Sequence, residues 1–417
     1  MASLKRLTGK AVVAVAVAAG VGLSCGKKAE PPPPAPAAAP APAAPRVRGV
    51  TDGEILLGMV ASFTGSNKER GRSMRTGWEM ALAQANEAGG INGRKLRLLA
   101  LDDGYDPART PPAMKELVET QGVFAIVGNV GTATSAVAVP YCMEKKVVFY
   151  GALSGGDGLR KTPPDRYVFN FRASLRREGE AAVKYLVQVR RVKPRRIAVL
   201  VQQDDFGESG WRGAARQLVS YGVRERDILK LGYPRNTADI SGAVARLRKR
   251  ARAYDAVVMV ATYKPAATFV RRGKDAGLKL FYLSVSADSN GLAEDLVQSG
   301  KRYTHNVGIT QVVPVPTSKA TAIIKYRQAL EKQSPGEKPG STTLEAWIGA
   351  QIFLEGLKRA GRDLDTEALV GALEGIHDWD IGIGAPITFT PNDHQGSRKV
   401  WGWLLQQDGT FKQVDLE

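Results

Sequence analysis

The residues best suited to hold a ligand lie in a run of small and polar side chains, residues 128–135. An apolar stretch, residues 123–127, ends at Gly128, and a helix of small residues is expected to begin near Thr132. A strand that stops in glycines and opens a helix leaves backbone N–H groups pointing at one spot. With the hydroxyls of the first helical turn, those groups predict a seat for a carboxylate or another anion. The alternative is a purely structural junction, which is common in α/β proteins.

Other chemistry has little support in the sequence. No Lys follows the glycines, which argues against a loop that holds nucleotide phosphates. No Ser stands in the Gly-x-Ser-x-Gly elbow of a hydrolase, and the Asp neighbours of His377 and His394 do not amount to a catalytic geometry. The pair Asp102 and Asp103 follows a predicted strand and is expected to bond neighbouring loops. We therefore predict that the protein is not an enzyme and needs no cofactor, with a tethered hydrolase as the weakest alternative.

The N-terminus is typical of an exported lipoprotein. Three basic residues precede an apolar run, residues 11–23, which is shorter than the ~20 residues of a membrane-spanning helix. Residues 1–24 are therefore predicted to be a lipoprotein signal peptide, and Cys25 is the predicted lipidation site. The alternative is an ordinary cleaved leader with a chance Cys. Residues 25–48 are rich in Pro and Ala and predict an extended tether that holds a globular body away from a membrane surface.

Composition narrows the possible partners. Lys and Arg number 59 against 41 Asp and Glu, a net charge of +18, and much of the excess lies in two clusters at residues 190–196 and 246–252. Neither cluster has interleaved aromatics, so a solvated basic face is favoured over attraction to anionic membranes or acidic solutes. Once the leader is removed, Cys142 is the only cysteine besides the predicted lipidated one, so no intrachain disulfide is expected. We expect no nucleic-acid partner and no metal site.

The body of the chain alternates between strands and helices in two blocks. The predicted strands are residues 54–60, 95–101, 123–127, 147–150, 197–201, 228–233, 256–261 and 280–285. The predicted helices are residues 71–88, 112–120, 132–144, 177–189, 209–219, 240–251 and 265–276. Helices of this length between strands indicate parallel sheets with right-handed crossovers. The predicted fold class is α/β, with two doubly wound parallel-sheet lobes and a ligand cleft at the carboxyl ends of the strands.

An ordered set of short motifs connects this pattern to a known family. The motifs are residues 55–60 with 63–65, 88–95, 101–103 with 106–107, 194–199, 206–208 and 276–279. In this order they resemble the branched-chain (leucine/isoleucine/valine-type) amino-acid binding proteins of ABC transporters, which have the type I periplasmic binding fold. The resemblance covers nearly the whole body from about residue 49 onward. It implies two lobes that are joined by three hinge strands.

The resemblance also implies where the lobes begin and end. Crossings between them are expected near Arg172, near Ile309 and within residues 392–401. Lobe I then comprises residues 49–172 and 312–392, including helices at 317–332 and 342–360, and lobe II comprises residues 173–311 and 393–417. Closure over a ligand is expected to be a hinge motion at the crossings.

Ligand contacts in the first lobe are implied by the same resemblance. Thr132 and Ser154 match hydroxyls that bind a ligand carboxylate, while Val130 and Ala152 match positions that contact the ligand through the backbone. Such donors satisfy a desolvated carboxylate, which cannot be buried unpaired.

Three features depart from the family pattern. Ser286 stands where amino-acid binders have an acidic residue for the ligand ammonium, and Asp288 is two residues off. Arg70 holds an aromatic position of the first loop, and Tyr105 and Gly131 stand where the best-known members have a disulfide. A lost carboxylate and a gained guanidinium favour a ligand more acidic, or less cationic, than leucine: an organic acid, an acidic or amide-type amino acid, or a small aromatic acid. The alternative for Arg70 is a solvated loop residue.

Two functions remain open. In both, the second-lobe aromatics Phe206 and Tyr263 match positions that close over the ligand, with core packing as their alternative role. In the first, a lipid-anchored periplasmic protein delivers an amino acid or a related small organic acid to an ABC permease of the inner membrane. In the second, the same lobes sense a ligand and report to a signalling or chemotaxis partner. The sequence does not separate these functions, and it does not separate anchoring to the inner membrane from anchoring to the outer one.

Overall fold

The computed structural model describes residues 47–286 and 288–416 of the chain. The predicted signal peptide, the predicted lipidation site Cys25 and nearly all of the predicted tether lie outside these residues. Within the described ranges, no helix has the apolar length that a bilayer crossing requires.

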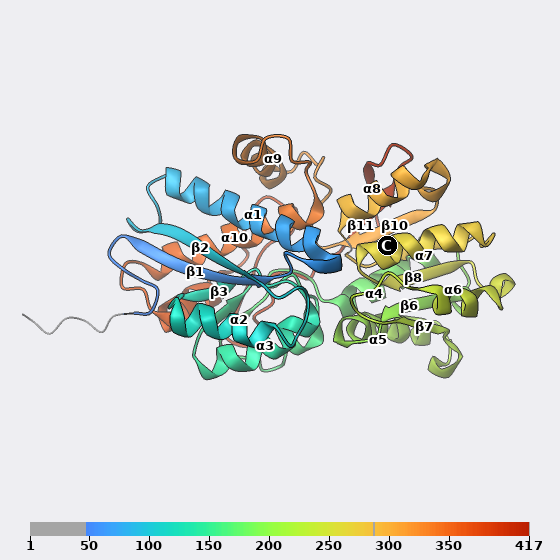
Figure 1. Cartoon of the computed structure of the whole chain (residues 1–417), viewed down its shortest axis with the longest axis horizontal. Helices are drawn as coiled ribbons and strands as arrows, with labels where there is room; N and C mark the ends of the chain where they lie inside the picture. The colour runs from blue at the N-terminus through green and yellow to red at the C-terminus, as the bar shows by residue number, and fades with distance from the viewer. Residues whose placement is uncertain (1–46, 287, 417) are drawn as a thin grey trace, which may run out of the picture. The chain divides into compact units, whose positions relative to one another are not determined.

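The first sheet has five parallel strands in the order β2-β1-β3-β4-β5. They are β1 (Glu54–Ala61), β2 (Lys95–Asp102), β3 (Ala125–Val127), β4 (Val148–Tyr150) and β5 (Val168–Phe169). Helices cover both faces, which is why the central strands are almost wholly apolar. One face carries α1 (Lys68–Glu87) and α10 (Ser341–Ala360), and the other carries α2 (Thr110–Lys115) and α3 (Thr132–Glu144) (Figure 1).

The alternation of side chains along β1 shows how the two faces are filled. Leu57 and Met59 belong to the same buried cluster as Trp78 of α1. Their neighbours Leu56 and Val60 point the other way, into a separate cluster with the residues of α2 and α3. Both faces of the sheet are therefore buried, and its carboxyl edge, which faces the other half of the body, is left to hold a ligand (Figure 1).

The second sheet has seven strands in the order β12-β11-β10-β9-β8-β6-β7. They are β6 (Ile197–Gln202), β7 (Lys230–Tyr233), β8 (Ala256–Val260), β9 (Phe281–Ser284), β10 (Val307–Gln311), β11 (Trp401–Leu405) and β12 (Phe411–Val414). Strands β6 to β10 are parallel, and β11 runs antiparallel to both of its neighbours. The helices of this half are α4 (Leu175–Lys184), α5 (Asp205–Ser220), α6 (Ser241–Arg248), α7 (Tyr263–Asp275) and α8 (Ser289–Ser299).

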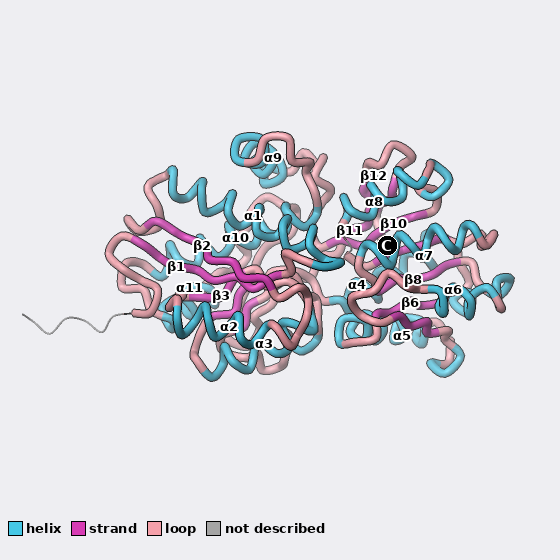
Figure 2. The backbone as a smooth tube through the Cα atoms, in the orientation of Figure 1, coloured by secondary structure: helices cyan, strands magenta, loops and turns pink. Residues whose placement is uncertain are grey.

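The chain passes between the two sheets three times, after β5, after β10 and before β11. Between the last two passages, α9 (Thr321–Gln333), α10 and α11 (Thr366–Glu374) return to the first half, where α10 packs along α1. We call the first sheet with α1–α3 and α9–α11 the first lobe, and the second sheet with α4–α8 the second lobe; Figure 2 shows their strands as two separate groups. The predicted fold class is confirmed, with β11 as an antiparallel addition. The residue boundaries given above for lobes I and II stay predictions.

Several predicted elements coincide with observed ones, and the differences have local causes. The helix predicted at 132–144 is α3, and the helices predicted at 112–120 and 177–189 each end in a π-helical turn, Glu116–Thr120 and Tyr185–Val189. The sequence analysis did not predict α8 or α11. Each begins at an Asp cap, Asp288 or Asp365, whose carboxylate accepts a hydrogen bond from the first turn. The two-residue strand β5 is too short to have a periodicity.

Candidate ligand-binding site between the two lobes

The predicted anion seat lies where β3 ends and α3 begins. Gly131, the residue before α3, has a φ of 113° and no side chain to cap the helix, so the first N–H groups of α3 have no side-chain cap there. The hydroxyl oxygens of Thr132 and Ser154 lie 2.8 Å apart and share a hydrogen bond. The hydroxyls of Thr134 and Ser135 instead donate to carbonyls one turn back, at 2.7 Å and 2.6 Å. The side-chain donors of the seat are therefore two hydroxyls, one from the first residue of α3 and one from the loop after β4.

A neighbouring loop, residues 151–156, forms the second side of the seat. It is tied to the first by Leu153 N–H, which donates to Asn129 O at 2.7 Å, and by Gly131 N–H, which donates to Leu153 O at 3.3 Å. Val130 pairs with Leu153 in the same bridge, and Val130 and Ala152, the two predicted backbone contacts, are buried. These contacts bring four of the predicted ligand residues, Val130, Thr132, Ala152 and Ser154, to one edge of the sheet.

Arg160 holds the 151–156 loop in place through hydrogen bonds to its backbone. Its guanidinium donates to Ser154 O and Gly156 O, both at 3.0 Å, and to Arg172 O at 3.1 Å. The Gly156 N–H donates to Ser154 Oγ at 3.1 Å, which orients that hydroxyl. No sequence pattern indicates this role, because the three acceptors are backbone carbonyls.

Tyr105 connects the seat to the second lobe. A Cβ placed on Gly131 would lie 2.3 Å from Cε2 of Tyr105, so the ring packs directly against the glycine backbone. Its hydroxyl accepts a hydrogen bond from Gln202 at 3.1 Å, and its carbonyl accepts one from Asn236 at 3.2 Å, both from the second lobe. Burial raises the pKa of Tyr105 to about 12, so the hydroxyl stays neutral. The two positions that hold a disulfide in the best-known family members are thus in contact here.

Arg70 is part of this interlobe region. It lies in the first turn of α1 and is only 7% exposed, so the alternative of a solvated loop residue is wrong. Burial lowers its pKa, and the positive charge of Arg172 acts in the same direction, while Tyr105, Asp288 and Glu345 oppose both. Those opposing groups belong to both lobes, which places the guanidinium between them.

The second-lobe residues predicted to close over the ligand are all buried. Phe206 lies in the first turn of α5 and belongs to a core cluster of the second lobe. Tyr263 is the first residue of α7 and packs against Gly291 of α8. Burial, Asp288 and Glu69 raise the pKa of Tyr263 to about 12, and Arg70 opposes that rise. Tyr263 therefore shares an electrostatic environment with Arg70 across the lobe boundary.

Ser286 is held by its own lobe. Its N–H and its hydroxyl donate to the carboxylate of Glu178, at 2.8 Å and 2.9 Å, and the Arg172 guanidinium also reaches its hydroxyl. Arg172 forms ion pairs with Glu178 of the second lobe at 3.1 Å and with Glu345 of the first lobe at 3.3 Å. This buried network joins both lobes at the first crossing. The sequence analysis missed Glu178 and Glu345, because each lies inside a helix far in sequence from the predicted site.

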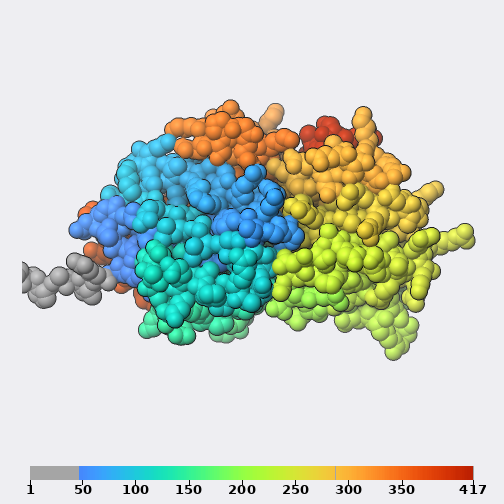
Figure 3. Space-filling view, in the orientation of Figure 1, coloured from blue at the N-terminus to red at the C-terminus, as the bar shows by residue number. Residues whose placement is uncertain are grey.

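Polar contacts around the seat hold the lobes together. The Asp157 carboxylate of the first lobe pairs with Arg176 at 2.8 Å and Arg212 at 3.2 Å, and the Asp157 N–H donates to Ser209 Oγ at 3.1 Å. A pocket of about 180 Å³ lies beside these contacts and has Thr132 in its wall. In the space-filling view of Figure 3, the two lobes meet along their boundary on the face that is shown. The described structure therefore has its lobes in contact over the predicted ligand residues.

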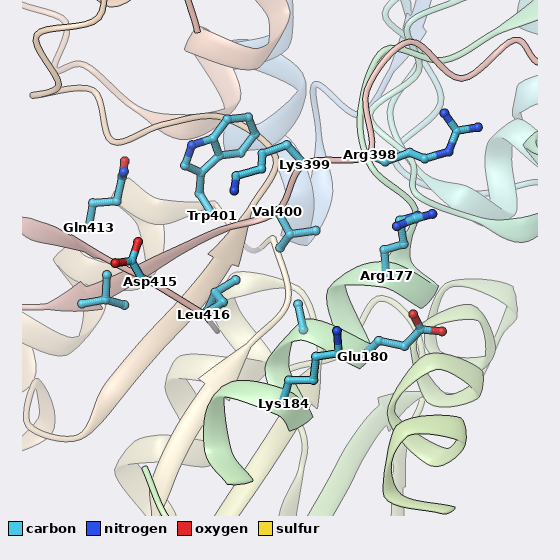
Figure 4. A pocket seen from close by; sticks show the side chains of 12 residues that line it. Arg177, Glu180, Lys184, Arg398, Lys399, Val400, Trp401, Gln413, Asp415 and Leu416 are labelled. Atoms are coloured by element: carbon cyan, nitrogen blue, oxygen red, sulfur yellow. The ribbon is translucent and has the colours of Figure 1, made fainter. Parts of the chain in front are cut away.

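A second pocket lies elsewhere, between α4 and the chain that enters β11 (Figure 4). Its volume is about 370 Å³, and its wall carries charges of both signs, including Arg177, Glu180, Lys399 and Asp415. None of the predicted ligand residues lines it. Among the described residues, no group of three or more His, Cys, Asp or Glu side chains is placed to hold a metal ion.

Comparisons with known proteins agree with this architecture. Residues 54–410 match the model of a family described as periplasmic binding protein. An amino acid binding protein from Pseudomonas aeruginosa is 24% identical over 341 residues, which cover 78% of this chain and 86% of the relative. A Leu/Ile/Val-binding protein homolog from Brucella abortus is 22% identical over 381 residues, which cover 87% of this chain and 90% of the relative. The crystal structure of a possible leucine/isoleucine/valine-binding protein from Rhodopirellula baltica is 32% identical, with a TM-score of 0.83 and coverage of 88% of this chain and 97% of that one.

These matches decide three of the predictions made from the sequence. The resemblance to leucine/isoleucine/valine-type binding proteins and the type I periplasmic binding fold are confirmed. The prediction that the protein is not an enzyme is also confirmed, because the family and the relatives are substrate-binding proteins. They bind small solutes in the periplasm and usually work with ABC transporters. On a match that extends over nearly the whole described body, the chain belongs to the periplasmic binding protein family.

Proposed function

We propose that this protein is the lipid-anchored solute-binding component of an ABC importer and captures an amino acid or a related small organic acid between its lobes. The observation that carries the proposal is the pair of buried hydroxyls, Thr132 and Ser154, beside the uncapped start of α3. A helix start without a side-chain cap, flanked by two hydroxyls, satisfies a desolvated carboxylate with several hydrogen bonds at once.

Ligand capture in this proposal is a closure about the three crossings. The ligand binds the first lobe through Thr132, Ser154 and the backbone of Val130 and Ala152. The second lobe then brings its aromatic side chains over it, and contacts such as those of Asp157 hold the closed form. The ligand shifts the population toward that form because it bonds to groups of both lobes only when they are together. The permease recognises the closed form.

The membrane attachment rests on the N-terminal sequence. A basic region, an apolar run and Cys25 followed by a proline-rich segment support export, lipidation and a spacer between the membrane and the binding body. Mass spectrometry of the protein purified from membranes tests this part: we expect a diacylglyceryl group on Cys25 and release into the soluble fraction for Cys25→Ala. An unmodified, soluble protein would remove the anchor from the proposal and leave ligand capture untouched.

Calorimetric titration of the mature protein tests ligand capture. The titrants are a panel of amino acids, amides, aliphatic mono- and dicarboxylates and benzoate. We expect saturable one-to-one binding of at least one carboxylate and a Kd about 10- to 100-fold weaker in Thr132→Ala. If the Kd is unchanged in Thr132→Ala, or if no compound of the panel binds, then Thr132 does not form a carboxylate seat. Native mass spectrometry of the freshly purified protein adds an unbiased view of what co-purifies.

A further inference from the structure

Arg70 is a buried cation that the fold itself does not use. Its side chain makes no hydrogen bond and no ion pair with another described residue, although only 7% of the residue is exposed. Its Nε is wholly buried and has no partner. Buried charges are normally paired, because a charged group loses its hydration on burial and needs equivalent bonds in return. A guanidinium in this condition is a candidate for contact with a bound anion.

Two nearby arginines show that burial alone does not leave a guanidinium without hydrogen-bond partners, as it is at Arg70. Arg172 bonds to Glu178, Ser286 and Glu345 through its terminal nitrogens. Arg160 directs its terminal nitrogens to three backbone carbonyls. The Nε atoms of both also lack partners, but their terminal N–H groups are engaged, whereas those of Arg70 are not. Of the three, Arg70 alone has both terminal nitrogens without a partner among the described residues.

The surroundings of Arg70 place these donors in the interlobe site. The groups whose charge it feels are Arg172 at the crossing, Tyr105 and Glu345 of the first lobe and Asp288 of the second. Tyr105 packs on Gly131, the residue before Thr132, so a tyrosine whose charge acts on Arg70 lies beside the hydroxyl seat. Asn67, which precedes α1, provides no side-chain cap to that helix and has a buried Oδ1 without a partner.

Nearby carboxylates do not replace a ligand at Arg70. None of them comes within ion-pair distance of it among the described residues. Glu345 is already paired with Arg172, and the Asp288 carboxylate accepts a hydrogen bond from Asn290 N–H at the start of α8. Burial raises the pKa of both carboxyls. An acidic group on the ligand would supply the missing charge and a bidentate partner for the guanidinium.

We propose that Arg70 is a second anion subsite, so that the ligand seated by its first carboxylate on Thr132 and Ser154 carries a second acidic group. The substrate class is then small dicarboxylates and amino acids with acidic side chains. This inference rests on the proposed function, since it assumes the first carboxylate seat. It narrows the ligand from carboxylates in general to compounds with two acidic groups.

Titration calorimetry of the mature protein with matched probes tests the proposal. The pairs are succinate against propionate, glutarate against butyrate and glutamate against glutamine. We expect the diacid of at least one pair to bind about 10- to 100-fold more tightly than its monoacid or amide, the range of a charge-assisted hydrogen-bond pair. Arg70→Gln should remove that preference and leave the weaker affinity of the monoacid within about 3-fold of its value, as expected when a bond to the second group alone is lost. Arg75→Gln, on the exposed face of the same helix, is the matched control and should change neither affinity.

The outcomes separate this inference from the function it rests on. Equal affinity for mono- and diacids in the unmodified protein, or an equal loss of both in Arg70→Gln, overturns the second subsite and leaves carboxylate capture standing. Binding of none of the probes overturns both. If Arg70→Gln does not fold, the preference of the unmodified protein between the paired probes decides the matter alone, and Arg70→Lys, which keeps the charge, should retain part of the preference.

Discussion

The hydroxyl oxygens of Thr132 and Ser154 lie 2.8 Å apart, although the two residues follow different strands of the first sheet. Both residues are buried, and they follow the carboxyl ends of the neighbouring strands β3 and β4. The neighbouring hydroxyls of Thr134 and Ser135 have the same chemistry but bond to their own helix. The predicted seat therefore consists of the hydroxyls of Thr132 and Ser154. The hydroxyls of Thr134 and Ser135, which bond to backbone carbonyls, provide control positions for mutagenesis.

Removing one hydroxyl of the pair should weaken carboxylate binding. For Thr132→Ala and for Ser154→Ala we expect a loss of about 1.5–3 kcal/mol, or about 10- to 100-fold in Kd, because each removes a hydrogen bond to a charged group. Calorimetric titration with the tightest carboxylate found measures the loss.

Ser135→Ala is the matched control for both variants. It removes a buried hydroxyl of the same helix turn, but one that donates to Gly131 O. We expect a Kd close to that of the unmodified protein and a change confined to thermal stability. Equal losses of affinity in all three variants would mean that the effect comes from destabilised packing and not from a seat.

Contacts of Asp157 across the lobe boundary should tune how long a ligand stays bound. Its carboxylate pairs with Arg176 and Arg212 of the second lobe, whose side chains are 42% and 56% exposed, so solvent screens both pairs. Such pairs contribute about 1 kcal/mol or less. We expect Asp157→Asn to raise the ligand dissociation rate by up to about 5-fold, with little change in association, because only the closed form loses contacts.

Stopped-flow measurements at low and high salt check this expectation. The dissociation rate of the unmodified protein should rise with salt and approach that of Asp157→Asn, since salt weakens exposed pairs. Asp165→Asn is the control, because Asp165 pairs with Lys161 inside the first lobe. A variant of Asp157 that releases ligand at the unmodified rate under all salt conditions would show that these pairs do not hold the closed form.

Much of the fold could be predicted because its signals are local. The helix at 132–144 and the strands near 54–60 and 95–101 follow from short runs of apolar or small residues and the glycines that end them. The junction between β3 and α3 could be predicted in the same way, since the strand, the glycines and Thr132 are neighbours in sequence, while its role as an anion seat stays a prediction. Elements without such a signal, such as α8 and the two-residue β5, were missed.

The electrostatic surroundings of the site could not be predicted, because they come from residues far apart in the chain. Glu178 and Ser286 are 108 residues apart, and their bonds explain why the serine is not free to replace the missing acid. Arg70 is buried and feels charges from both lobes, and no pattern around residue 70 encodes either property. The sequence shows that Arg70 stands at a position that is aromatic in the family. It does not show whether the arginine side chain is solvated or buried.

Asp102 should make the stability of the first lobe depend on pH in the acid range. Burial raises its pKa, but the hydrogen bonds from Thr64 and from the backbone N–H groups of Phe63 and Gly104 outweigh burial and lower the pKa from 3.8 to about 2. Because the pKa is lower in the folded state, the group stabilises the fold above about pH 4, and this contribution is lost as the pH falls toward 2. The shift corresponds to about 2 kcal/mol.

Urea unfolding as a function of pH measures that contribution. Asp102→Asn should lower the free energy of unfolding by about 2 kcal/mol at pH 7 and show a shallower decline between about pH 4 and pH 2 than the unmodified protein. Asp52→Asn, at an exposed position whose side chain bonds to no other described residue, should follow the unmodified curve. A parallel decline in the Asp102 variant would assign the acid sensitivity to other carboxylates.

Arg160 should act on binding only through the loop that it holds. Its guanidinium bonds to the carbonyls of Ser154 and Gly156 and not to the hydroxyl of Thr132, so Arg160→Met should loosen one side of the seat without removing a ligand donor. We expect a loss of affinity of about 3- to 10-fold for every carboxylate, from the ordering that the ligand must then supply. The ratio of diacid to monoacid affinity should stay constant, in contrast to the change expected for Arg70→Gln.

Titration of Arg160→Met and Arg166→Met with the same paired probes distinguishes positioning from contact. Arg166 is a nearby arginine whose ion pairs with Glu367 and Glu374 lie away from the seat, so its variant should bind like the unmodified protein. Arg160→Lys retains one donor and should recover part of the affinity. A change in the diacid to monoacid ratio in Arg160→Met would mean that Arg160 itself contacts the ligand, and the seat would then extend to the back of the 151–156 loop.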